Sequence, residues 1–288
     1  MSEEITKYER KYNLELNLKC DRVSQQTICY HQYATYPLRL SPVFRLEGVN
    51  SNRAYLYIMN TSPGLLAGDE LNLSLHLAAN SNLYLSDQSA TKVHPMPQIS
   101  TKAVINYQIE VDAGATWEFV PEPIILYTDS ALEQNMQIKV HPTAKLFLSE
   151  IILPGRLARG ESYQFRYYFN RLQVTDLTGK LLFTDAMRLE GKLNPFNNNK
   201  LFTSLPIIGN AIAILPDIDL KLLSTSLESI PEANYPQLTV ATSILPHNQG
   251  LVIRALANKT IELKNYFRSA LNCIRTVTHQ SPLPYIPK

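Results

Sequence analysis

Apolar and polar residues alternate strictly in three stretches near the middle of the chain. In residues 71–77 four leucines fall on one face of an extended strand and three polar residues fall on the other. The same alternation recurs in residues 105–111 and 136–140. A period of two is typical of strands rather than helices, so this pattern predicts β-structure at the centre of the protein.

Each alternating strand is followed by a short turn and a second apolar run, which makes a weak internal repeat. Three sets of apolar residues align, with the second member six positions after the first and the third two positions further on: Leu77, Leu83 and Leu85; Val111, Trp117 and Phe119; Val140, Leu146 and Leu148. One such unit cannot bury its apolar face alone, whereas stacked units can. The repeat predicts a mainly β fold of layered strands with a β-helix-like or solenoid-like core.

We expect residues 1–288 to form one folding unit with two parts. The β core extends over about residues 12–193, and an α+β C-terminal part extends over about residues 200–288. An asparagine-rich segment at residues 194–199 marks the boundary between them. Residues 1–11 are polar and are expected to fray.

The C-terminal part is predicted to contain about two helices and a hairpin. Pro216-Asp217 offers an N-cap for a first helix that carries three leucines on one face. Residues 261–277 keep helical spacing of apolar side chains and predict a second helix. Residues 238–244 and 251–256 read as the two strands of a hairpin.

Composition and charge narrow the class of protein. Hydrophobic residues make up 45% of the chain, charged residues 18%, and the net charge is +2. A net charge so close to zero gives no electrostatic case for binding nucleic acid or an anionic membrane. The charged fraction is below the roughly 25% of an average soluble domain. It indicates extensive buried surface or an exposed face that needs a partner.

The cysteines and the N-terminus predict a cytoplasmic protein without a membrane segment. Cys20, Cys29 and Cys273 match no metal or redox spacing, which favours reduced thiols. The first residues carry acids where a signal peptide carries bases. No apolar run approaches the length that spans a bilayer.

Motifs for common enzyme chemistry are missing from the sequence. It contains no P-loop, no H-E-x-x-H, no C-x-x-C and no G-x-S-x-G. Acidic residues instead gather near predicted loop ends: Asp69, Asp87, Glu118, Glu122, Asp129, Glu150 and Glu161. Two of them would serve as a general acid and base only if folding brings them together. Asp69 and Glu161 each follow a glycine and also fit ordinary turn chemistry.

Four segments, in chain order, resemble the UreD family of urease accessory proteins, which is called UreH in some organisms. They are residues 63–69, 87–92, 117–124 and 155–161, and the resemblance covers nearly the whole chain. The matching motif positions are Gly64, Gly68, Asp69, Thr91, Lys92, Glu118, Pro121, Glu122, Gly155, Arg156, Gly160 and Glu161. Pro63 and Ala67 depart from the family, which usually has glycine at both positions.

The resemblance implies a scaffold rather than an enzyme. Such proteins bind the accessory protein UreF and, through it, the GTPase UreG, and they dock on apo-urease to deliver nickel. The resemblance implies no tightly bound cofactor, only nickel in transit.

Carboxylates, backbone carbonyls and an occasional imidazole can hold Ni²⁺ weakly enough to release it. From their motif positions, we expect Asp69, Asp87 and Glu161 to line or shape a nickel passage. Glu122 and His94 are further candidates.

Two other readings remain open from the residues themselves. A β-solenoid module that binds a ligand or carbohydrate would need a ladder of exposed aromatic side chains. The run of Tyr163, Tyr167, Tyr168 and Phe169 is the stretch that would supply it. A small hydrolase or lyase with paired acids would turn over substrate without any partner.

Overall fold

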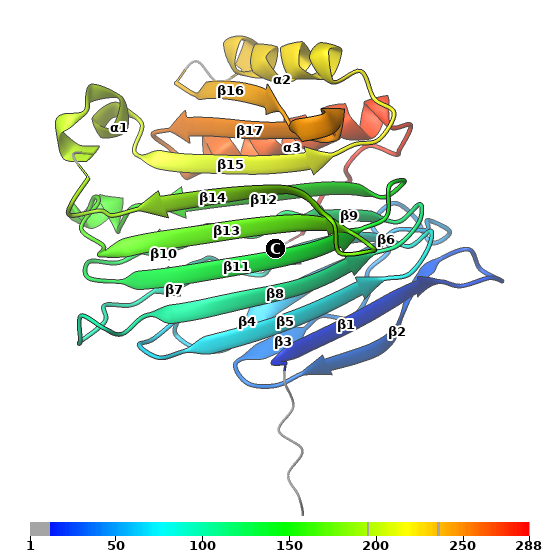
Figure 1. The fold of residues 1–288 in the computed structure, drawn as a ribbon, viewed down its shortest axis with the longest axis horizontal. Coiled ribbons are helices and arrows are strands. Elements are labelled where there is room, and N and C mark those ends of the chain that lie inside the picture. The colour runs from blue at the N-terminus through cyan, green and yellow to red at the C-terminus, as the bar shows by residue number, and fades with distance from the viewer. Residues whose placement is uncertain (1–11, 195, 235–236, 288) are drawn as a thin grey trace, which may run out of the picture.

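The alternating stretches form the strands of two stacked sheets in the computed structural model, which describes residues 12–194, 196–234 and 237–287 (Figure 1). The first sheet has seven strands in the order β14 (Leu181–Leu189), β13 (Tyr167–Asp176), β11 (Ala131–Val140), β8 (Ala103–Val111), β5 (Glu70–Leu77), β1 (Leu14–Cys20) and β2 (Thr27–Ala34). The expected fraying of residues 1–11 concerns a segment outside the described residues.

The second sheet has ten strands and continues through both parts of the chain. Its order is β16 (Thr239–Ile244), β17 (Gly250–Ala257), β15 (Ile207–Ile214), β12 (Lys145–Leu153), β9 (Thr116–Phe119), β6 (Asn82–Asp87), β4 (Ala54–Asn60) and β3 (Leu38–Leu40). Beside this path β10 (Ile124–Leu126) pairs with β12 and with β7 (Thr91–Val93). The predicted hairpin is confirmed as the antiparallel pair β16–β17.

The internal repeat in the sequence corresponds to register in the sheets. Leu77, Val111 and Val140 are neighbours in the parallel ladder of β5, β8 and β11. The partner positions of the repeat, occupied by Leu83, Trp117 and Leu146, are neighbours in the ladder of β6, β9 and β12. The chain therefore passes from the first sheet to the second in each copy, and matching apolar residues stack on one another.

The mainly β prediction is confirmed, but the structure does not show a β-helix or solenoid. Antiparallel pairs extend the parallel ladders of both sheets: β1–β2 and β13–β14 in the first, and β12–β15 in the second. The result is a pair of mixed sheets. The aromatic run noted in the sequence is a strand only from Tyr167 onward, and Tyr163 itself has a left-handed backbone with φ of 54°.

Three α-helices and three single 3₁₀ turns lie in the described part of the chain. The helices are α1 (Lys200–Ser204), α2 (Leu220–Asn234) and α3 (Thr260–Val277), and the turns are η1 (Leu157–Arg159), η2 (Phe196–Asn198) and η3 (Pro246–Asn248). The N-cap expected at Pro216-Asp217 is wrong. Asp219 caps α2, since its Oδ1 accepts from the Leu222 amide at 3.0 Å.

Two apolar cores hold these layers together. The larger lies between the sheets and includes Leu75, Trp117 and Leu146. The smaller lies between the second sheet and the helices and includes Phe147 and Phe267. Figure 1 shows α2 and α3 alongside β15, β16 and β17. Over the described residues, no helix combines the length and apolarity that crossing a bilayer would take.

Candidate functional site

The first two sequence motifs are joined through their backbones at one end of the sheets. The Leu65 amide donates to the Lys92 carbonyl at 2.8 Å, and the His94 amide donates to the Leu65 carbonyl at 2.9 Å. Gly64 permits this approach, because a Cβ there would lie 2.5 Å from the Lys92 carbonyl oxygen, and its φ is 147°. The loop before β5 is thereby held against β7.

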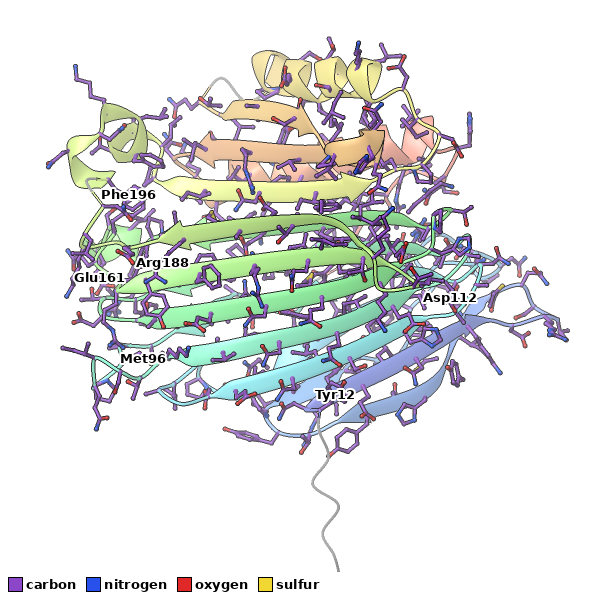
Figure 2. The ribbon with its side chains drawn as sticks, in the orientation of Figure 1. Tyr12, Met96, Asp112, Glu161, Arg188 and Phe196 are labelled. Atoms are coloured by element: carbon purple, nitrogen blue, oxygen red, sulfur yellow. The ribbon has the colours of Figure 1, made fainter. Side chains whose placement is uncertain are left out.

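Tyr127 links His94, which lies two residues after the second motif, to Arg156 of the fourth motif. The His94 ring meets the Tyr127 ring edge-on with centroids 5.2 Å apart, and His94 Nε2 lies 3.2 Å from the Pro63 carbonyl oxygen. The Arg156 guanidinium lies 4.4 Å from the centroid of Tyr127. Arg156 Nε donates to Glu161 Oε2 at 2.8 Å, and this hydrogen bond lowers the pKa of Glu161. Glu161, labelled in Figure 2, is thus half of an ion pair that shapes its loop.

Asp69 and Glu118 also have structural partners. Asp69 Oδ2 accepts from the Leu66 amide at 2.7 Å and closes the turn before β5. Glu118 accepts from Arg275 Nε of α3 at 2.8 Å, and Arg275 is 0% exposed. Arg275 Nη1 also lies 2.9 Å from Glu47 Oε1. Glu118 therefore ties α3 to the outer face of the second sheet.

A cavity of about 100 Å³ lies between the two sheets. Four carboxylates contribute to its wall among mostly apolar side chains: Asp87, Glu122, Glu150 and Asp185. A smaller cavity of about 50 Å³ shares Asp87 and Tyr107 with the first. Burial raises the pKa of Tyr107, with smaller contributions from the charges of Asp87 and Glu150. The interior of this protein is therefore acidic as well as apolar.

Glu150 is held in the cavity wall by uncharged donors. Its Oε1 accepts from Gln134 Nε2 at 2.9 Å and from Asn170 Nδ2 at 3.0 Å. The Tyr168 hydroxyl also donates to Oε1, and Asn210 Nδ2 donates to Oε2 at 3.3 Å. Burial raises the pKa of Glu150, while these hydrogen bonds oppose the shift. These four side-chain donors are neutral, so a cation that binds Glu150 would not have to displace a positively charged one of them.

Two other acids of the wall form ion pairs. Arg254 Nη2 lies 2.7 Å from Asp185 Oδ1 and 2.8 Å from Oδ2. Lys264 Nζ lies 2.5 Å from Glu122 Oε2, and burial lowers the pKa of Lys264. The cavity wall thus combines ion-paired acids with a carboxylate bound by neutral groups.

The structure separates the five residues predicted for nickel into two groups. Asp87 and Glu122 line the cavity, together with the motif residues Thr91 and Pro121. Asp69, His94 and Glu161 have the loop contacts described above and are not among the residues that line it. The remaining motif glycines shape those loops: Gly68, Gly155 and Gly160 all have positive φ, and a Cβ on Gly155 would lie 2.5 Å from the Glu161 carbonyl oxygen.

Sequence reasoning noted Glu150 only as one of several acids and missed its neighbours in the wall. A signal was present, because Glu150 is in phase with Leu148 and Ile152, which face the core between the sheets. The same holds for other polar residues placed on the inward phase of their strands: Gln134, Asn170, Asp185 and Asn210. A polar residue at an expected core position is costly unless it is satisfied, so a group of them indicates a site.

These features define a two-sheet β protein with an acid-lined interior and helices packed on the outer face of one sheet. Comparison with known proteins gives the family. The sequence profile described as UreD urease accessory protein matches residues 13–288. The chain belongs to the UreD family of urease accessory proteins.

Individual relatives agree with this assignment. A urease accessory protein UreD from Trichodesmium erythraeum is 54% identical over 276 residues, which cover 96% of this chain and 99% of the relative. One from Photorhabdus laumondii is 32% identical over 211 residues, covering 73% of this chain and 65% of the relative. One from Haloarcula marismortui is 28% identical, covering 93% of this chain and 88% of the relative. Membership in this family supports a role in urease maturation.

Proposed function

We propose that this chain is a cytoplasmic scaffold that delivers nickel to urease. It binds UreF and, through UreF, the GTPase UreG, and it docks on apo-urease. Nickel is its cargo rather than a resident cofactor. Family membership supports the maturation role. The three cysteines are free thiols in the structure, which fits a reducing compartment.

The acid-lined cavity is the observation that carries the nickel part of this proposal. A Ni²⁺ ion entering an apolar interior would lose its hydration unless oxygen ligands replaced the water. Asp87, Glu122, Glu150 and Asp185 supply carboxylates along that wall. Since Glu150 is bound only by neutral donors among its recorded contacts, it is the acid best placed to accept a cation without breaking an ion pair.

Asp69, His94 and Glu161 have a different part in the proposal. Their hydrogen bonds hold the loops at the end of the sheets where the first, second and fourth motifs meet. We propose that they shape the mouth of the passage or the surface that a partner contacts. Alanine substitution of each tests this: unchanged urease activation with an intact complex would leave only a local structural role.

We further propose that the chain acts as one UreD-like unit rather than two domains. The second sheet continues across the predicted boundary, because β12 of the first part pairs with β15 of the second over seven residue pairs. Arg275 on α3 adds a buried ionic contact to Glu118 on β9. Both contacts favour joint folding.

The carbohydrate-binding alternative receives no support from the aromatic run. Tyr163 is 2% exposed and Tyr168 is 0% exposed, so these rings are core residues rather than a binding ladder. We therefore retain the scaffold proposal alone.

Co-expression with UreF and UreG tests the partner assignment. We expect size-exclusion chromatography with light scattering to show one defined complex that contains this chain. A monodisperse chain that elutes alone in the presence of both partners would overturn the scaffold proposal.

Asp87→Asn and Glu122→Gln should preserve the complex but slow nickel-dependent urease activation. Glu70→Gln, an isosteric change at an exposed position, is the matched control.

A further inference from the structure

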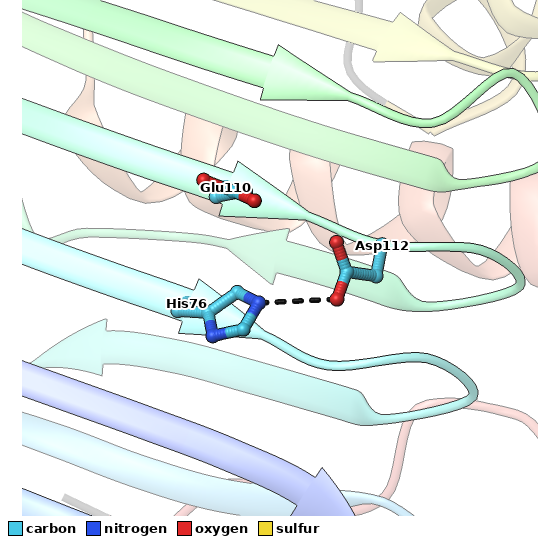
Figure 3. A group of neighbouring side chains, drawn as sticks. All are labelled: His76, Glu110 and Asp112. Atoms are coloured by element: carbon cyan, nitrogen blue, oxygen red, sulfur yellow. Dashed lines mark hydrogen bonds and ion pairs between the residues drawn. The ribbon is translucent and has the colours of Figure 1, made fainter. Parts of the chain in front are cut away.

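Three potential metal ligands converge on the first sheet, far from the motif loops. They are His76 on β5, Glu110 on β8 and Asp112 directly after β8, and one ligand atom from each lies within 4.8 Å of the others (Figure 3). Within residues 12–194, 196–234 and 237–287, this is the only group of three such side chains that meets this distance. Figure 2 shows Asp112 at the opposite end of the sheets from Glu161.

The parallel ladder places these side chains together. His76 and Glu110 are register neighbours on β5 and β8, so both point to the outer face of the first sheet. Asp112 is two residues after Glu110 and returns to the same face. The Asp112 amide donates to the Leu77 carbonyl at 2.9 Å, which anchors the residue at the end of the strand. The arrangement therefore rests on backbone geometry.

The distances suit a shared metal ion. His76 Nε2 lies 3.1 Å from Asp112 Oδ2. A first-row divalent ion binds imidazole nitrogen and carboxylate oxygen at about 2.0–2.2 Å, so two of its ligands lie about 3–3.5 Å apart. A small rotation of the exposed Glu110 side chain would bring the third ligand to the same ion.

We propose that His76, Glu110 and Asp112 form a surface site for a first-row divalent transition-metal ion such as Ni²⁺ or Zn²⁺. One imidazole with two carboxylates matches the preference of these ions better than that of Mg²⁺ or Ca²⁺, which favour oxygen ligands alone. A groove of about 480 Å³ along the outer face is lined by His76, Glu110 and Lys139. It leaves room for water or another ligand on the ion.

Lys139 is the charge that opposes this site. It is the register neighbour of Glu110 on β11 and shares the outer face. Its positive charge repels a bound cation and attracts Glu110. Lys139→Gln should therefore tighten metal binding by about two- to threefold, as expected for removing one solvent-screened charge. A plain His76–Asp112 ion pair would give no such dependence on Lys139.

Titration of the full-length protein with NiCl₂ and ZnCl₂ by isothermal calorimetry tests the site. The wild type should bind one more equivalent than His76→Ala or Asp112→Asn, and Glu110→Gln should weaken the binding of that equivalent at least tenfold. His31→Ala is the matched control. His31 Nε2 also lies 3.2 Å from a carboxylate, Glu15 Oε2, on the same sheet, but no second acid joins this pair in the described residues.

The expected result is loss of one equivalent in the site variants and no loss in the control. Equal stoichiometry and affinity in wild type and His76→Ala would overturn the proposal, as would displacement of Ni²⁺ by equimolar Mg²⁺. Circular dichroism checks that each variant is folded. If His76→Ala does not fold, the stoichiometry of the isosteric variant Asp112→Asn is compared with that of the wild type instead. The surface site does not depend on the proposed nickel passage. Glu150→Gln leaves all three ligands of the surface site in place, so this variant should still bind the additional equivalent.

Discussion

Glu150 occupies a position that the alternation of β12 reserves for an apolar side chain. It stands between Leu148 and Ile152 on the inward phase, yet it is a carboxylate. Desolvating a carboxylate is unfavourable, and the surrounding amides and hydroxyl offset only part of that cost. A residue that lowers stability in this way and is nevertheless well oriented is a strong candidate for function.

The first prediction concerns the stability of Glu150→Gln. Burial raises the pKa of Glu150 in the folded protein, so above the ordinary carboxyl value of 4.5 the folded state binds more protons than the unfolded chain. Stability linked to this group is therefore present at low pH and lost as pH rises through the folded pKa. The neutral glutamine should be more stable than wild type near pH 8 by roughly 1–2 kcal/mol.

Urea unfolding at several pH values measures this difference. It should shrink as pH falls below the ordinary carboxyl value of 4.5, because glutamate then becomes protonated in both the folded and the unfolded state. Glu70→Gln, which changes an exposed acid, should show no comparable gain. A Glu150→Gln variant that is less stable than wild type at every pH would contradict the assignment of Glu150 as a destabilising buried acid.

The second prediction concerns the buried charges beneath α3. Arg275 is fully buried and pairs with Glu118, itself 2% exposed, and with Glu47. Arg275→Met would leave these two carboxylates with Arg53 as their only cationic partner among the described residues, at 3.1 Å from Glu47 and 3.4 Å from Glu118, and the lost pairing costs roughly 3 kcal/mol. Arg268→Met on the same helix is the control, because Arg268 donates to the Pro284 carbonyl in an exposed setting. Chemical denaturation should separate the two variants, and similar losses in both would refute the structural role of Arg275.

The connection between the first motif and β7 yields a third prediction, at the scale of elements. Gly64→Ala should lower stability by roughly 2 kcal/mol or more, because the new Cβ would meet the Lys92 carbonyl oxygen at 2.5 Å. Gly68→Ala provides the comparison: its φ is also positive, at 85°, but no atom lies within 4 Å of the new Cβ. The smaller loss should be roughly 1 kcal/mol.

Hydrogen exchange locates this effect. The His94 amide, which bonds to the Leu65 carbonyl at 2.9 Å, should exchange faster in Gly64→Ala than in Gly68→Ala. Equal exchange in both variants would show that the close approach of the loop to β7 does not depend on glycine at position 64.

Several elements were predictable from the sequence because their causes are local. Alternation with period two gave the strands near residues 71–77 and 105–111, and the aligned repeat matched the observed ladder register. Helical spacing of apolar residues predicted a helix over residues 261–277, and α3 begins only one residue earlier. The cap of α2 was misplaced, since the choice between Asp217 and Asp219 depends on how the surrounding chain folds.

The candidate site was less predictable because it is assembled from distant strands. Asp87 and Glu122 were named from family motifs, and both line the cavity. Glu150 on β12 and Asp185 on β14 also line the cavity. These two residues are distant in the sequence, so no local spacing of residues indicates that they lie close together. The one signal in the sequence was that these polar residues stand at strand positions whose neighbours in the alternation are apolar core residues. That signal indicates a shared interior only once the two sheets are known to stack on each other.

At the scale of the whole molecule, the two sheets have distinct roles. The first presents a polar outer face with the His76, Glu110 and Asp112 group, whereas the second carries the helices on its outer face. The cavity lies between the sheets, so an ion within it would be surrounded by both. Exposed apolar side chains remain on connecting loops, such as Ile99 at 92% and Leu193 at 78% exposure, and these are reasonable contacts for a partner.

The central claim is that nickel passes through the interior of this protein on its way to urease. Nickel content and activity of urease should therefore be measured after activation with wild-type chain or Glu150→Gln, at equal amounts of assembled complex. Glu70→Gln serves as the control. The account predicts at least a tenfold slower rise of urease activity and nickel content with Glu150→Gln, despite its greater stability. Wild-type rates and full nickel loading with this variant would contradict it.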